Sequence, residues 1–225
     1  MIFKRKVYDK LLKWKNLSAG SSAALLEGAR RIGKTTIVEE FAKNVYDDYM
    51  ILDFARENDA VRRNFLENMD DLDTFFRNLF LLKGKELKGD NCVLIFDEIQ
   101  LFPAARQAIK YLVADGRYEY IETGSLISIR KNVQNILIPS EEYRIKMYPM
   151  DFEEYLWAIG DTVTFPVLQE AFNKKKPLGD SIHRKIMKNF RTYMAVGGMP
   201  QAVDAFVDGK TFSQIDFIKR NILDL

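Results

Sequence analysis

Gly28-Ala-Arg-Arg-Ile-Gly-Lys-Thr35 satisfies the pattern G-x-x-x-x-G-K-[ST], and this stretch decides the fold of the chain. The apolar run Ala23–Leu26 precedes it and is typical of a buried strand. Thr36–Val45 follows it, with apolar residues at helical spacing. A strand, a glycine-containing loop and a helix in this order are the context in which the pattern holds phosphates. The stretch therefore predicts a phosphate-binding loop, or P-loop.

The chemistry of a P-loop requires these residue types. Glycines let backbone N–H groups curl around phosphate oxygens, and the start of the helix adds partial positive charge. Lys34 is expected to reach the terminal phosphates of ATP or ADP and to act in catalysis there. The Thr35 hydroxyl is expected to be a ligand of Mg²⁺, which holds the β- and γ-phosphate oxygens. The residues predicted to bind the nucleotide are Gly28, Ala29, Arg30, Arg31, Ile32, Gly33, Lys34, Thr35 and Thr36. For Arg30 and Arg31 the alternative is that they face water.

A second motif is the apolar run Val93–Phe96 with Asp97 and Glu98 directly after it. Carboxylates at the carboxyl end of a buried parallel strand lie where α/β sheets bind their ligands. Asp97 is expected to bind magnesium directly or through water, and Glu98 to accept the proton of the attacking water. Alone this pattern is weak, because any strand with a solvated exit can show it. The P-loop earlier in the chain makes it convincing.

Three weaker candidates complete the predicted site. Thr123-Gly-Ser125 follows the strand candidate Tyr118–Ile121. Its hydroxyls either sense the γ-phosphate and orient the water, or belong to a turn that caps a helix. Arg144 is the first candidate for a cation that stabilises the transition state, and Arg130 is the second. Both arginines are equally compatible with ordinary surface positions.

Composition excludes several other classes of protein. The 225 residues carry 34 Lys and Arg against 32 Asp and Glu, so bulk charge gives no case for nucleic-acid binding. One cysteine, Cys92, and one histidine, His183, rule out an intrachain disulfide and a Cys/His zinc site. No apolar run is long enough for a transmembrane helix, and the charged start is unlike a signal peptide. These features predict a soluble, cytoplasmic chain without a membrane partner. The absence of an N-K-x-D stretch argues against a GTPase.

Strand and helix patterns alternate through the first part of the chain. Strands are predicted at Ala23–Leu26, Tyr49–Phe54, Cys92–Phe96, Tyr118–Ile121 and Tyr143–Met147, and helices near 3–15, 36–45, 72–80 and 104–114. This alternation predicts an α/β domain at 1–150, with a five-stranded parallel sheet flanked by helices. The strand signal then stops, and 151–225 is predicted to be a small helical region with helices near 152–159, 182–194 and 212–225.

The motifs together resemble a prokaryotic AAA-like ATPase family with a C-terminal domain of unknown function that is thought to be nuclease-like. The resemblance rests on Leu26–Thr36, Leu94–Gln100, Glu122–Ser125 and Tyr148–Tyr155, and it covers about Asn16 to Val207. It implies a P-loop sheet of the ASCE type, in which Glu98 is the catalytic acid/base residue. Ala29 departs from the family pattern, which usually has proline there.

Tyr193–Pro200 looks like the opening of the family's C-terminal domain. Because the chain stops soon afterwards, with no helix stop signal, we expect it to end inside a larger protein.

Three hypotheses on function remain open. The first is an ATPase that couples turnover to a conformational change or a protein partner, self-association included, and Glu98 favours it. The second is a nucleotide-dependent binding switch with little turnover. The third is the ATPase core of a DNA-binding or nuclease protein. Lys174–Lys176 and Lys83–Lys88 could contact nucleic-acid phosphates, although such runs are usually solvated.

Overall fold

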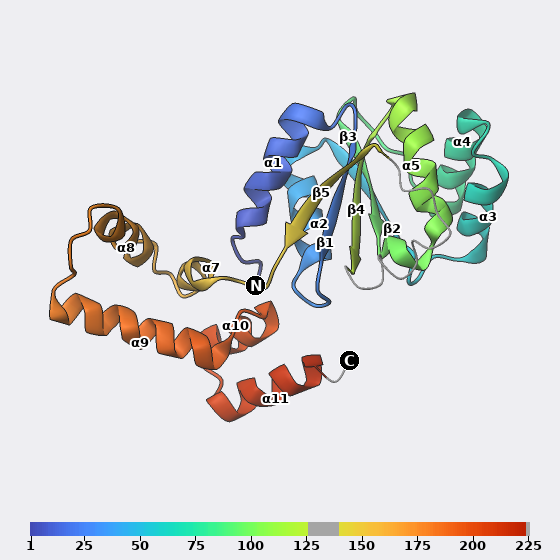
Figure 1. Ribbon diagram of the computed structural model, residues 1–225. Coiled ribbons are helices and arrows are strands. Elements are labelled where there is room, and N and C mark those ends of the chain that lie inside the picture. The colour runs from blue at the N-terminus through green and yellow to red at the C-terminus, as the bar shows by residue number, and fades with distance from the viewer. Residues whose placement is uncertain (126–139, 224–225) are drawn as a thin grey trace. The chain divides into compact units, whose positions relative to one another are not determined.

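The computed structural model describes residues 1–125 and 140–223. Their contacts group them into two units (Figure 1). The sheet unit consists of Val7–Arg30 and Lys34–Met147. The helical unit consists of Met1–Lys6, Arg31–Gly33 and Tyr148–Leu225. Three residues of the predicted P-loop therefore group with the helical unit, and the domain boundary expected at residue 150 stays a prediction.

The sheet unit alternates strands and helices along the chain. Its elements are α1 (Lys6–Ser18), β1 (Ala23–Gly28), α2 (Lys34–Val45), β2 (Asp48–Asp53), α3 (Asp59–Glu67), α4 (Leu72–Lys83), β3 (Cys92–Asp97), the 3₁₀ turn η1 (Ile99–Leu101), α5 (Pro103–Asp115), β4 (Glu119–Ser125) and β5 (Glu142–Met147). Proline opens α5, where its missing N–H leaves no helical bond unmade, and Gly116 ends it in the left-handed conformation.

The five strands form one parallel sheet in the order β2-β3-β4-β1-β5. All residues of β1 and β3 are buried, as expected for a parallel sheet with helices on both faces. Figure 1 shows α1 and α2 on one side of this sheet and α3, α4 and α5 on the other. The predicted fold class, a five-stranded parallel sheet flanked by helices and followed by a helical region, is confirmed.

The larger core lies under α3, α4 and α5. Leu25, Phe96 and Tyr120 supply it from β1, β3 and β4, and Phe54 and Phe65 pack edge to face beside them. Side chains alternate between the faces of a strand, so the next residues along β3 and β4 point toward the α2 side. This alternation places Asp97 and Thr123 together on the α2 face.

The helical unit has its own small core. Its helices are α7 (Phe152–Ala158), α8 (Thr164–Asn173), α9 (Asp180–Val196), α10 (Pro200–Val207) and α11 (Phe212–Leu223). Asp151 and Glu154 form a capping box at the start of α7. The Met150 N–H donates to the Gly198 carbonyl at 2.7 Å, and a side chain at Gly198 would collide with the Met150 carbonyl. The Gly-Gly pair within Tyr193–Pro200 thus permits a close approach of two backbones.

Within the described ranges, the structure adds three α-helices that the sequence pattern did not reveal, α3, α8 and α10. In α3 the buried Asn64 hides the apolar stripe, because its amide points inward and donates to the Phe75 carbonyl at 2.9 Å. Within the part of the chain that the structure describes, no helix is long and apolar enough to cross a membrane.

Candidate nucleotide site

The P-loop joins the end of β1, Gly28, to the start of α2, Lys34. Within it Arg31 has φ of 61° and Gly33 has φ of 90°. The left-handed region suits glycine and is uncommon for arginine, so the loop holds Arg31 in a costly conformation. Ala29, Arg30 and Arg31 are exposed, as are Thr35 and Thr36 at the helix start. The loop predicted from the sequence therefore stands at the carboxyl edge of the sheet.

Lys34 is only 5% exposed and lies against the loop that it serves. Its ammonium group donates to the Ala29 carbonyl at 2.8 Å and to the Gly28 carbonyl at 3.3 Å. Burial lowers the pKa of Lys34, while the negative charges of Glu98 and Asp97 oppose that effect. A desolvated cation beside two carbonyl oxygens is placed to exchange those weak acceptors for phosphate oxygens.

Thr35 and Asp97 meet at the base of the loop. The Thr35 hydroxyl donates to the two Asp97 carboxylate oxygens at 2.9 and 3.0 Å. Two oxygen ligands at neighbouring corners of an Mg²⁺ octahedron, with bonds of about 2.1 Å, are themselves about 3.0 Å apart. Both groups are hard oxygen donors, so the pair is chemically suited to hold magnesium, and its role as a set of metal ligands stays a prediction. Among residues 1–125 and 140–223 no cluster of three or more acidic, His or Cys side chains could hold a metal by itself.

Thr123 connects the carboxylates to β4, the strand between β1 and β3. Its hydroxyl donates to Asp97 Oδ1 and accepts the Glu98 N–H at 3.3 Å. β4 continues through Ser125, so Thr123 lies within the strand. The alternative of a turn that caps a helix concerns the residues after Ser125, which lie outside the described residues. Burial raises the pKa of Asp97, with the hydroxyls of Thr123 and Thr35 opposing the shift and Glu98 adding to it.

Glu98 comes directly after β3 and has φ of 53°, the left-handed conformation. Its side chain is half-buried, and its carboxylate accepts a hydrogen bond from Gln100 Nε2. The structure thus brings together Lys34, Thr35, Asp97, Thr123 and, through Gln100, the backbone N–H of Ser125.

Arg144 is not brought to this edge of the sheet. It pairs in register with Leu25, three residues before the P-loop begins, and it lies three residues before the end of β5. Its side chain is 48% exposed, and its nearest anion is Glu142 at 3.4 Å. The sequence supplied the residue type, but the register places it about 10 Å along the strand from the carboxyl edge. Arg130, the second candidate, lies outside the described residues.

Two residues that contact the candidate site, Arg5 and Gln100, were not predicted from the sequence. Arg5, 6% exposed, donates to the Ile32 carbonyl at 2.9 Å and to the Tyr148 carbonyl at 2.6 Å. It lies in a Lys-Arg-Lys run that gives no sign of this role. Gln100 lies inside the Leu94–Gln100 motif that carried the family resemblance, so a signal existed, yet its role becomes visible only from its contacts.

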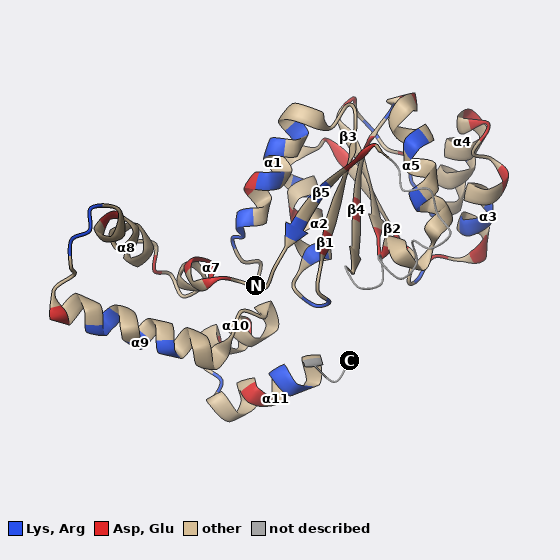
Figure 2. Cartoon of the chain, viewed as in Figure 1, with Lys and Arg blue, Asp and Glu red and all other residues tan. Residues whose placement is uncertain are grey.

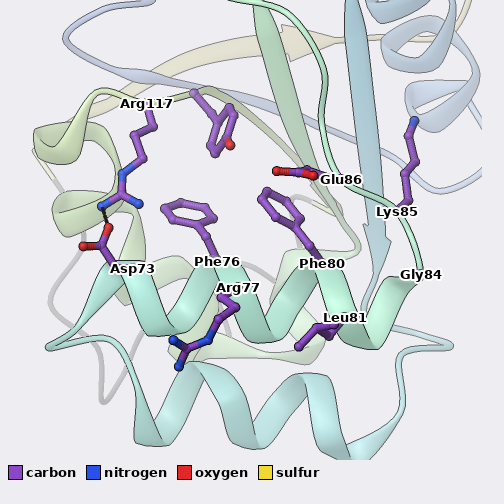
Figure 3. Close-up of a pocket in the computed structure, with 10 residues that line it drawn as sticks. Asp73, Phe76, Arg77, Phe80, Leu81, Gly84, Lys85, Glu86 and Arg117 are labelled. Carbon is purple, nitrogen blue, oxygen red and sulfur yellow. Dashed lines mark ion pairs between the residues drawn. The ribbon is translucent and has the colours of Figure 1, made fainter.

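A separate pocket of about 600 Å³ lies at the other end of the sheet (Figure 3). Phe76 and Phe80 of α4 form one wall, and Arg117 stands over the Phe76 ring while pairing with Asp73 at 2.7 Å. Arg117 precedes β4, so this pocket is at the amino end of a strand about 20 Å long. It is distinct from the nucleotide site at the carboxyl end.

The predicted nucleic-acid contacts differ in their surroundings. In the Lys83–Lys88 cluster, Lys83 pairs with Glu57 at 2.5 Å and Lys85 with Asp48 at 2.6 Å, which neutralises both. Lys174–Lys176 is exposed in the turn after α8, where Lys174 pairs with Glu170 at 2.5 Å, and basic residues continue along α9 (Figure 2).

Strand order 2-3-4-1-5, a P-loop after β1 and an Asp-Glu pair at the end of β3 define a P-loop NTPase domain. The chain belongs to the AAA domain family, which matches residues 20–156. Membership implies nucleotide binding. No curated protein matches the chain.

Among solved structures, the chain is similar to DnaA from Aquifex aeolicus in its AMPPCP-bound form. The two are 11% identical with a TM-score of 0.49, over 91% of this chain and 59% of the DnaA chain. The chain therefore spans less than two thirds of that protein's length, and a likeness at this level carries no functional argument.

Proposed function

We propose that this chain is an ATPase module that binds Mg²⁺-ATP at the P-loop and hydrolyses it with Glu98 as the general base. The observation that carries the proposal is the contact between Thr35 and Asp97 with Glu98 beside it. That contact joins the helix after the P-loop to the acidic end of β3. The family supports nucleotide binding, and the carboxylates support hydrolysis.

Each residue has a distinct part in the proposed reaction. Lys34 and the loop N–H groups bind the β- and γ-phosphates and offset their charge. Thr35 and Asp97 would hold Mg²⁺, which supplies neutralisation of phosphate charge when it is bound. Glu98 orients a water and accepts its proton, while the water oxygen bonds to the γ-phosphorus and the bond to the ADP oxygen breaks. A binding switch with little turnover would not need this base.

We further propose that turnover drives a conformational change or acts on a partner. Arg31–Gly33 group with Tyr148–Leu225 by their contacts, and Arg5 binds both the Ile32 and the Tyr148 carbonyls. A phosphate entering the loop acts on Ile32 and its neighbours, and Arg5 holds the Ile32 carbonyl. The nucleotide state can thereby change the hydrogen bonds that Arg5 makes to the Ile32 and Tyr148 carbonyls.

Phosphate release with Mg²⁺-ATP tests the proposal. Glu98→Gln should abolish turnover and retain ATP binding, because an amide cannot accept the water's proton while the Asp97 ligand remains. Glu67→Gln, an exposed glutamate at the end of α3, is the matched control and should behave as wild type.

Binding is followed by thermal unfolding. Saturation at a hundred times Kd stabilises a protein by about 2.7 kcal/mol, and Lys34→Ala should lose most of this shift. An equal shift in wild type and Lys34→Ala would refute the binding site. Equal turnover in wild type and Glu98→Gln would refute the role of the base.

A further inference from the structure

The Glu98 carboxylate has a direct partner two residues along the chain. Gln100 is the central residue of η1, and its Nε2 donates to Glu98 Oε2. Gln100 is 4% exposed, so its amide is held in place by the protein and is not exchanging with water. A buried amide that touches the proposed general base is well placed to control where that base points.

The second amide atom of Gln100 fixes its orientation. The Ser125 N–H donates to Gln100 Oε1 at 3.3 Å. A backbone N–H can only donate, so the atom that faces it must be the oxygen. The nitrogen then faces the Glu98 carboxylate, which as an ion can only accept. The donor and the acceptor of each of these hydrogen bonds are therefore fixed. The Ser125 N–H donates to Gln100, and Gln100 donates to Glu98.

Glu98 is tied to the tip of β4 twice. Its backbone N–H donates to the Thr123 hydroxyl at 3.3 Å, and its carboxylate is tied through Gln100 to Ser125. The left-handed backbone of Glu98, with φ of 53°, is a conformation that needs such support in a residue with a side chain. Hydrogen bonds thus hold both the backbone and the side chain of Glu98 to β4, the strand that lies between β1 and β3.

We propose that Gln100 is a positioning residue that holds the Glu98 carboxylate by one oxygen and leaves the other to accept the water's proton. This inference rests on the proposed ATPase function and deepens it. Because Gln100 already restricts the rotamers of the Glu98 carboxylate, less side-chain entropy is lost in the transition state. Loss of Gln100 should therefore lower kcat. None of the contacts above involves a P-loop residue, so loss of Gln100 should leave the affinity for the nucleotide unchanged.

Two substitutions separate positioning from folding. Gln100→Leu removes the bonds to Glu98 and to the Ser125 N–H at similar volume. Gln100→Glu keeps an acceptor for the Ser125 N–H, removes the donor to Glu98 and places a like charge beside it. Both should lower kcat, by about tenfold for leucine, the size of one hydrogen bond to a charged group, and at least as far for glutamate. KM and the ATP-induced thermal shift should stay at the wild-type values.

The control and the double mutant complete the experiment. Asn64→Leu removes another buried amide of the sheet unit and should lower stability without changing kcat. In the Glu98→Gln background, single-turnover assays of any remaining hydrolysis should show no further loss from Gln100→Leu, because the group it positions is gone. An unchanged or raised kcat in Gln100→Leu, or an equal loss in both backgrounds, would overturn the inference alone. Turnover that Glu98→Gln leaves intact would refute the proposed function and this inference with it.

Discussion

At the residue scale, Glu122 is the side chain whose placement has the clearest consequence. It is completely buried in β4, and neither carboxylate oxygen has a hydrogen-bond partner among the described residues. Burial raises the pKa of Glu122 well above its usual range, and Glu142 adds to the shift, while Arg106 and Arg144 oppose it. A buried carboxyl without a partner is more stable protonated, so the folded protein holds a proton there that the unfolded chain releases.

This proton gives a prediction for stability against pH. Above the usual glutamate range the folded state binds more protons than the unfolded state, so unfolding becomes easier as the pH rises. Glu122→Gln keeps the shape without the titration and should remove that part of the pH dependence. Urea unfolding from pH 5 to 8 measures it, and the advantage of the variant over wild type should grow with pH. Parallel profiles for the two proteins would show that Glu122 does not titrate in this way.

At the element scale, the insertion of β4 between β1 and β3 builds the site. Register pairs Leu26 with Thr123 on one side and Phe96 with Glu122 on the other, so Thr123 stands opposite Asp97. Its hydroxyl satisfies a buried carboxylate oxygen and a backbone N–H at once. One strand tip therefore organises the acidic ends of its neighbour.

Thr123→Val tests the contribution of that strand tip. Valine keeps the volume and the β-branch, but it leaves Asp97 and the Glu98 N–H without this partner, which costs about 1–3 kcal/mol of stability. Thr123→Ser retains the hydroxyl and should lose less. Denaturant unfolding of the pair measures the difference, and phosphate release should fall further in the valine variant. If serine and valine are equivalent in both assays, the hydroxyl has no organising role.

At the scale of the whole molecule, Arg144 does not bring a cation for the transition state to the proposed active site. Arg144 lies too far back along β5. An arginine that neutralises the transferring phosphoryl group is worth about 10³- to 10⁵-fold in P-loop enzymes, and it often comes from a neighbouring subunit. We therefore expect the isolated chain to hydrolyse ATP slowly.

Protein concentration distinguishes the sources of that arginine. If a second copy supplies it, the rate of phosphate release per molecule should climb as the concentration rises. Arg144→Ala should leave the rate near that of wild type, because the register keeps this side chain from the carboxyl edge. Fast turnover that is independent of concentration and is lost in Arg144→Ala would contradict this prediction.

The sequence by itself determined the features that depend only on residues close together in the chain. The P-loop is contiguous, so its phosphate-binding character is written in eight consecutive residues. Asp97 and Glu98 follow from a buried strand and its exit. The five strands follow from apolar runs or from alternating apolar and polar residues between turns. A helix with a polar residue on its buried face, such as α3 with Asn64, lacks the continuous apolar stripe that would predict a helix.

Only the tertiary structure decided what depends on strand order and register. No local sequence pattern predicts that β4 lies between β1 and β3. That strand order brings Thr123 to Asp97, and it links Ser125 to Glu98 through Gln100. The same register withdraws Arg144 from the site, and folding alone brings Arg5 to the Ile32 carbonyl, 27 residues away. Such contacts join distant segments, and packing of the whole sheet selects them, so no local pattern encodes them.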